Sequence, residues 1–430
     1  MCLPGLFMSS SVARKIGFWS LVSIVISSQV GSGIFMLPAS LAHFGGIAAF
    51  SWVFTGCGAI LLALAFAELS KRFPKNGGPH VFVQEAFGKN AAFFVAWGYW
   101  VISWSSTTAV IIASIGYFGS LFGGFDIKTG LILELLLLWF FTWINLKGVK
   151  ASGYIEIVFT VLKVVPLIVL PIACIPHFQI ENFIPLNTSG TSNLSALNAA
   201  ALITFWGFIG VECATTPADS VDNPKRTIPR AIIFGTITVA IINLLCSLAI
   251  MGVVPMEQLK ISKAPFTDAA KFAFGGNLHY FISLAAAVVC FGTLNAWILV
   301  SGQIALGAAQ DGLFPKVFAK QNSNGSPYFS ILAASLGMVP LILFTLNDNL
   351  VDQFTKIIDN SVTVFLIIYA ICILSLLKIL ARDKASLISY IIAIAALLFC
   401  GWALFACSAE MIIISISVFL SGLPIYLLKK

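Results

Sequence analysis

The sequence predicts an all-α, polytopic membrane protein with about twelve transmembrane helices. Of the 430 residues, 59% are hydrophobic and only 10% are charged, which is too little polar surface for a water-soluble fold. Apolar runs of roughly 20 residues, the length that crosses a hydrocarbon core about 30 Å thick, recur along the chain. Two of these runs are interrupted by glycine-containing breaks.

The expected spans follow one another with short polar connections. They cover residues 16–40, 47–69, 91–119, 130–147, 153–175, 197–218, 230–254, 281–308, 328–346, 359–380, 387–406 and 410–428. The longest polar stretch, from His177 to Asn198, lies between two spans. We therefore expect residues 1–430 to form a single domain embedded in the lipid bilayer.

The distribution of Lys and Arg predicts the orientation of these spans. If the N-terminus is cytoplasmic, eighteen of the 24 basic residues fall on the cytoplasmic side, one lies inside a span, and five fall on the other side. The five are Lys128, Lys260, Lys263, Lys271 and Lys356. Because basic residues accumulate in cytoplasmic loops, we expect both termini in the cytoplasm. The net charge of +7 is explained by this bias and does not indicate a nucleic-acid partner.

The chain offers no pattern typical of a metal site or an enzyme. Its nine cysteines are dispersed, without a C-x-x-C pair, and its four histidines stand apart at positions 43, 80, 177 and 279. We therefore expect no catalytic residue, no metal and no cofactor. The segment from Met1 to Ser11 lacks the features of a cleaved signal peptide, so the first span should stay in the membrane.

The two interrupted spans are candidates for a ligand site. The first break is Gly31-Ser32-Gly33, and the second is Trp206 to Gly210, within the run from Thr204 to Glu212. Inside hydrocarbon an unpaired backbone group costs several kcal/mol, so a broken helix is tolerated only where it lines a cavity or meets a ligand. Breaks in corresponding halves of a chain indicate a transporter's binding site. For the first break, a glycine patch that packs against another helix is the alternative.

The chemistry of the two breaks suits a ligand that carries a carboxylate and an ammonium group. A half-helix that starts near Gly33 presents free N–H groups and the positive end of its dipole to a carboxylate. Carbonyl groups freed near Trp206 can accept from an ammonium group, and the indole of Trp206 can close over the ligand. Trp297 is central in the eighth span, which favours stacking against a cation over anchoring at the membrane surface.

Two of the charged residues inside expected spans are functional candidates. Glu212 follows the second break, and Lys163 lies in the middle of the fifth span. A charged side chain at such depth faces a cavity or a partner and is a functional candidate. We expect Glu212 to sense protons and Lys163 to take part in coupling. The alternatives are a Glu212 that is merely capped by backbone amides and a Lys163 that extends to the membrane surface.

Two short segments indicate an internal repeat. Residues 78–88 follow the second span and residues 264–275 follow the seventh, and both place Pro near their start and Phe-Gly at their end. Since five spans separate them, the second copy must be inverted. We expect a first repeat at 14–175, a second at 197–380 and two additional helices at 387–430. Chance similarity between two short segments is the alternative.

Four stretches together resemble the amino acid–polyamine–organocation superfamily, and within it the basic amino acid/polyamine antiporters. They are Gly31-Ser32-Gly33-Ile34-Phe35 with Leu37-Pro38, Ala67-Glu68-Leu69-Ser70 with Gly77-Gly78-Pro79, Trp206 to Glu212 with Asn223-Pro224-Lys225-Arg226-Thr227, and Ala308 to Pro315. The resemblance covers most of residues 14–380 in the family's order. The local sequence is similar to arginine/agmatine, ornithine/putrescine and lysine/cadaverine antiporters.

This resemblance implies five plus five inverted helices with two more at the C-terminus, broken helices 1 and 6, and transport by alternating access. The substrate carboxylate would rest on the first break and the amino group on carbonyls of the second. Trp206 would be the gate and Glu212 the proton sensor. The substrate-binding residues it implies are Gly31, Ser32, Gly33, Thr107, Thr204, Trp206, Trp297 and Ser361.

We therefore expect a secondary amino acid transporter in the bacterial inner (plasma) membrane, an antiporter that exchanges a cationic amino acid for its decarboxylated amine or another amino acid. Two departures from the arginine exchanger keep an alternative open. Thr107 replaces a longer amide side chain, and Lys163 replaces a small residue. A lysine there resembles the sodium surrogate of proton-coupled transporters, so the alternative is a symporter of neutral or broad specificity. Expected partners are an amino acid or polyamine and protons, with a homodimer left open.

Overall fold

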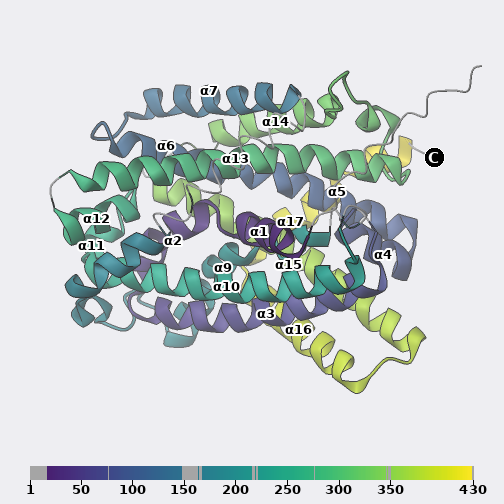
Figure 1. Ribbon diagram of the computed structural model, residues 1–430, viewed down its shortest axis with the longest axis horizontal. Coiled ribbons are helices and arrows are strands. Elements are labelled where there is room, and N and C mark those ends of the chain that lie inside the picture. The colour runs from purple at the N-terminus through teal and green to yellow at the C-terminus, as the bar shows by residue number, and fades with distance from the viewer. Residues whose placement is uncertain are drawn as a thin grey trace, which may run out of the picture.

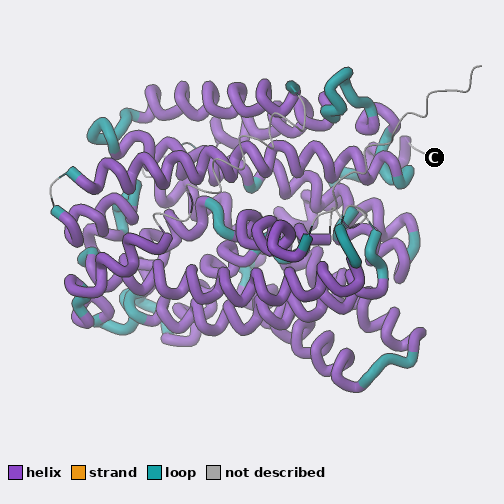
Figure 2. Tube along the Cα trace, in the orientation of Figure 1, coloured by secondary structure: helices purple, strands orange, loops and turns teal. Residues whose placement is uncertain are grey.

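The computed structural model describes residues 17–75, 77–147, 163, 167–215, 218, 221–275, 277–344, 346 and 350–428. Helices joined by short loops make up this part of the chain (Figure 2). The helices of the first half are α1 (Phe18–Gln29), α2 (Ser32–Leu41), α3 (Ile47–Arg72), α4 (Pro79–Phe87), α5 (Lys89–Ser105), α6 (Thr107–Ser120) and α7 (Ile127–Leu146).

The second half continues in the same way. Its helices are α9 (Asn193–Phe205), α10 (Pro224–Val253), α11 (Met256–Leu259), α12 (Pro265–Phe274), α13 (Leu278–Gln310), α14 (Tyr328–Phe344), α15 (Leu350–Asp383), α16 (Leu387–Ala406), α17 (Ala409–Leu420) and α18 (Leu423–Leu428). Short 3-10 turns include η1 (Ala42–Phe44), η4 (Trp206–Phe208) and η5 (Cys213–Thr215).

Ten helical segments of the described chain are long and apolar enough to cross a membrane. Two shorter apolar helices, Leu167–His177 and Tyr328–Phe344, lie where the fifth and ninth spans are expected. Most of the expected fifth span, 153–175, lies outside the described residues. The polytopic all-helical class is confirmed, and α1 with α2 forms the expected broken first span.

The tenth span begins earlier than hydropathy predicts. It is expected at 359–380, whereas α15 begins at Leu350. In its first two helical turns, Val351 and Phe354 are buried, whereas Asp352 and Lys356 are exposed. Such an amphipathic stretch lowers the average hydropathy without breaking the helix. As a result, Ser361 lies in the interior of α15.

The two short segments of the expected repeat are both helices. α4 and α12 each start with a proline at the first helical position, where no backbone N–H is needed, and each ends at a glycine with positive φ, Gly88 (84°) and Gly275 (61°). Figure 1 shows them at opposite ends of the long axis of the molecule. We call these ends the α4 end and the α12 end.

The broken helices are enclosed by continuous ones. α10 packs along α3, and α13 packs along α6, while α1 lies near the centre of the view in Figure 1. α7 lies at the periphery and exposes large apolar side chains: Leu136, Trp139, Phe140 and Trp143. An apolar outer face and an enclosed broken pair are what a lipid solvent requires.

Candidate functional site

The first break lies between Gln29 and Ser32. α1 ends at Gln29 and α2 begins at Ser32, with Gly31 as the residue before the new helix. The first N–H groups of α2 have no acceptor within their own helix. The Ser32 hydroxyl is 1% exposed and has no hydrogen-bond partner among the described residues. The start of α2 is therefore equipped to bind an anion.

The second break follows α9, which ends at Phe205. The chain continues as η4 and then as a turn in which Gly210 has φ 106°, a conformation that favours glycine. Asn243 donates to the Gly207 carbonyl at 2.9 Å. Ser28 of α1 donates to the Gly210 carbonyl at 3.1 Å. The two breaks are thus joined by a direct hydrogen bond.

Trp206 closes over the first break. A Cβ atom added at Gly33 would lie 2.7 Å from Trp206 Cδ1, and one added at Gly31 would lie 2.8 Å from Thr293 Cγ2. Only glycine allows such approaches. The space left between the breaks, which we call the central cavity, is about 20 Å³, enough for about one water molecule. It is lined by Ser28, Gln29, Gly31, Ser32, Gly33, Ser106, Thr107, Val110, Trp206, Ile209, Thr293 and Trp297.

The structure brings most of the predicted binding residues to this cavity and leaves two outside its lining. Those at the cavity are Gly31, Ser32, Gly33, Thr107, Trp206 and Trp297. Thr204 packs against α3, where its hydroxyl pairs with that of Thr55 at 3.0 Å. Ser361 donates to the Ile357 carbonyl of its own helix at 2.6 Å.

Sequence reasoning missed several lining residues, although signals for some were present. Thr293 precedes Trp297 by four residues on α13, and that spacing puts both on one face of a helix. Ser106 is the joint between α5 and α6, where Thr107 bonds back to the Ser103 carbonyl at 2.7 Å. Gln29 had no signal beyond its position next to the glycines.

Glu212 is held by two tyrosines that the sequence did not single out. Its carboxylate is fully buried and accepts from Tyr99 of α5 at 2.8 Å and from Tyr369 of α15. The Gly210 N–H points at Tyr369 Oη at 3.4 Å. The cluster ties α5 and α15 to the second break, so its hydrogen bonds must change if these elements separate. The only signal was two tyrosine hydroxyls placed in the middle of apolar spans.

Lys163 reaches the end of α1. Its side chain is 4% exposed, and its Nζ donates to Ser27 Oγ at 2.8 Å and to the Ser27 carbonyl at 3.3 Å. The side chain therefore does not extend to the membrane surface. A cation near the C-terminal end of a helix is also favoured by the helix dipole.

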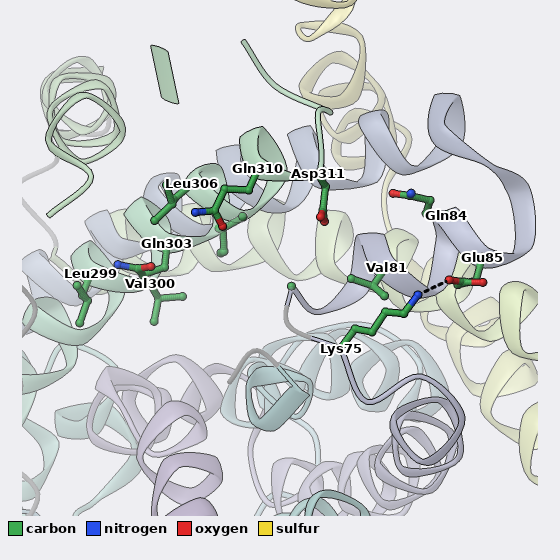
Figure 3. Close-up of a pocket in the computed structure, with 13 residues that line it drawn as sticks. Lys75, Val81, Gln84, Glu85, Leu299, Val300, Gln303, Leu306, Gln310 and Asp311 are labelled. Atoms are coloured by element: carbon green, nitrogen blue, oxygen red, sulfur yellow. Dashed lines mark hydrogen bonds and ion pairs between the residues drawn. The ribbon is translucent and has the colours of Figure 1, made fainter. Parts of the chain in front are cut away.

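A large cavity of about 600 Å³ opens at the α4 end. Figure 3 shows Gln303 and Gln310 extending from α13, with Glu85 on α4 and its ion pair to Lys75. The Lys75–Glu85 pair measures 2.9 Å, and this hydrogen bond raises the pKa of Lys75. Leu299 of α13 lines this cavity, and it follows Trp297 of the central cavity by two residues, which is less than one helical turn.

A second cavity, of about 360 Å³, lies on the other side of the central cavity. It is lined in part by Ser40, His43, Asp352 and Asp359. Ser40 follows Ser32 on α2 by eight residues, which is about 12 Å along a helix. η1, which contains His43, packs against α11 at the α12 end. The closed central cavity thus lies between cavities at the two ends of the molecule.

Comparison with known proteins agrees with this arrangement. The amino acid permease family matches residues 16–426. The cadaverine/lysine antiporter of Escherichia coli (strain K12) is 30% identical over 410 residues, covering 93% of this chain and 91% of its own length. The putrescine transporter PotE of Haemophilus influenzae is 30% identical over 380 residues, covering 88% and 87%. PotE of Escherichia coli (strain K12) is 29% identical over 381 residues, covering 86% and 85%.

These relatives are transporters, and their similarity extends over nearly all of the spans described above. The family match also includes both helix breaks and the residues of the central cavity. The chain therefore belongs to the amino acid permease family of the amino acid–polyamine–organocation superfamily, within its basic amino acid/polyamine antiporter branch.

Proposed function

We propose that the protein is a secondary active antiporter that exchanges a cationic amino acid for its decarboxylated amine. The observation that carries this proposal is the central cavity, where the N-terminal end of α2, the second break and two tryptophans meet. The names of the relatives, which pair lysine with cadaverine or denote putrescine, support the substrate class. Broken helices that meet around a small ligand are the device by which such transporters bind their substrates.

The substrate carboxylate would bind to the Ser32 hydroxyl and the first N–H groups of α2. Its cationic end would lie against Trp297, a contact worth about 0.5–2 kcal/mol. The closed cavity of about 20 Å³ is too small for an amino acid, so Trp206 must move to admit one. Thr204 and Ser361 would reach the substrate only after the helices rearrange.

Alternating access would connect the central cavity first with one end of the molecule and then with the other. We infer from the basic residues that the α4 end faces the cytoplasm, that both termini are cytoplasmic, and that the membrane is the bacterial inner membrane. The opposite placement of α4 and α12 supports inverted repeats at 14–175 and 197–380, followed by helices at 387–430. Protons would act at Glu212, and a homodimer is compatible with the apolar outer face.

Proteoliposomes test the exchange directly. Vesicles loaded with lysine, ornithine, arginine or their amines should take up labelled partner substrate, whereas vesicles containing buffer alone should not. Uptake into empty vesicles under a pH gradient would contradict antiport.

The second candidate is proton-coupled uptake, favoured by the burial of Lys163 against Ser27. In that case Lys163→Met, which keeps the length of the side chain and removes its charge, should abolish uptake driven by a pH gradient. Under antiport the same variant should retain exchange between loaded vesicles within about threefold. Uptake by Lys163→Met that still follows the pH gradient would exclude Lys163 from coupling.

A further inference from the structure

Gln29, the last residue of α1, is built into the central cavity in a specific orientation. Its side chain is 4% exposed, and its Nε2 donates to Thr236 Oγ1 of α10 at 3.2 Å. Its Oε1 is buried and has no hydrogen-bond partner among the described residues. The bond to Thr236 holds the amide, and Gln29 is one of the residues that line the central cavity.

The other hydroxyl groups of the cavity, apart from Ser32, donate to backbone carbonyls. Ser28 donates to the carbonyls of Val25 and Gly210, Ser106 and Thr107 to that of Ser103, and Thr293 to that of Val289. No Asp, Glu or Asn lines the cavity among the described residues. Gln29 therefore supplies the only side-chain carbonyl oxygen in this lining.

We propose that Gln29 Oε1 accepts a hydrogen bond from the ammonium group that both exchanged substrates share. The proposal rests on the proposed exchange of an amino acid for its amine. The two substrates differ by one carboxylate. The start of α2 can therefore bind the carboxylate of the amino acid, whereas the amine has no such group. An ammonium group offers three donors and no acceptor, which matches an unpaired amide oxygen. A buried acceptor of this kind costs free energy while it stays unpaired, so it favours ligands that donate to it.

The position of Gln29 fits this assignment. It precedes Ser32 by three residues, so an ammonium acceptor and a carboxylate-binding helix start flank the same break. Thr236 acts as a positioning residue, because it contacts Gln29 and is not part of the cavity lining.

Two charged residues lie close to the helix breaks. Lys163 binds Ser27, two residues before Gln29, and Glu212 accepts from Tyr369, whose hydroxyl also accepts from the Gly210 N–H. Neither lines the central cavity. The ammonium would therefore be held by amide and carbonyl dipoles, and a carboxylate introduced at position 29 would be the first charge in the lining.

Three variants test the proposal in reconstituted vesicles, with labelled lysine and cadaverine or whichever pair the unmodified protein exchanges. Gln29→Met keeps the length and loses the acceptor, so the KM for both substrates should rise by about 10- to 100-fold. Gln29→Glu should shift the preference towards the diamine by about tenfold or more, because its charge attracts ammonium and repels the substrate carboxylate. Thr236→Val should raise both KM values by a smaller factor.

The outcomes separate this proposal from the proposed exchange. Unchanged KM values in Gln29→Met, or a change for the amino acid alone, would overturn the role of Gln29. If Gln29→Met elutes as an aggregate in detergent, the preference of Gln29→Glu decides, and an unaltered ratio of the two substrates contradicts the proposal. If the unmodified protein exchanges no pair, the proposed function fails instead.

Discussion

Replacing Gly33 with valine is expected to reduce exchange by about 100-fold or more while the protein still inserts and folds. A single Cβ at this position would already lie 2.7 Å from Trp206 Cδ1, inside van der Waals contact. Either the indole rotates away or the start of α2 shifts, and both changes remove the closed state through which exchange must pass. Exchange by reconstituted protein, normalised to the amount recovered, measures the effect.

Two further variants identify the cause. Gly33→Ala should lose about tenfold, less than valine, because the clash is smaller. Gly130→Ala on α7 is the matched control, since its Cβ would have nothing within 4 Å, and it should leave exchange unchanged. The ring in Trp206→Phe is smaller than the indole. This substitution should therefore reduce activity less in the Gly33→Ala variant than in the unmodified protein. Such non-additivity indicates direct contact between the two residues. Additive losses would show that Gly33 acts elsewhere.

Glu212→Gln is expected to flatten the pH dependence of exchange. The carboxylate accepts hydrogen bonds from Tyr99 and Tyr369 at once. Glutamine keeps the shape but cannot gain or lose a proton, and its NH₂ group cannot accept from a tyrosine hydroxyl. The variant should therefore resemble the protonated protein at every pH, with a rate at about pH 7.5 close to that of the unmodified protein at about pH 5.

The matched controls are Tyr99→Phe and Tyr369→Phe, which remove one donor each and keep the ring packing. A hydrogen bond to a charged group contributes about 1.5–3 kcal/mol, so each should displace the pH profile while a pH dependence remains. If Glu212→Gln keeps the profile of the unmodified protein, Glu212 is not the proton-sensing group, whatever its burial. Initial rates between about pH 5 and 8 provide the comparison.

The positions of the spans could be predicted from sequence because lipid imposes a local rule. Every backbone group in the hydrocarbon core must be paired within its own helix, so apolar run length alone places α3, α7, α13 and α16 within a few residues. The rule fails where a helix is amphipathic, and α15 accordingly begins nine residues before the expected start at 359. The same rule identified the breaks, because glycines within an apolar run mark positions where a membrane helix can be interrupted.

The partners of the site residues could not be predicted in this way. Glu212 is bound by Tyr99, 113 positions away, and by Tyr369, 157 positions away. Lys163 contacts Ser27 across 136 positions. Each of these pairs depends on which faces of which helices pack together, and single-sequence periodicity does not specify helix neighbours.

For this protein, composition, run length and two glycine breaks determined that the chain crosses the membrane many times and that its first and sixth spans are interrupted. Only the tertiary structure decided that Trp206 packs on Gly33, that Gln29 lines the cavity and has a buried oxygen without a partner among the described residues, and that Thr204 and Ser361 lie outside the cavity lining. The physical reason is that solvation by lipid acts on each segment separately, whereas the contents of a binding site depend on contacts between segments far apart in the chain.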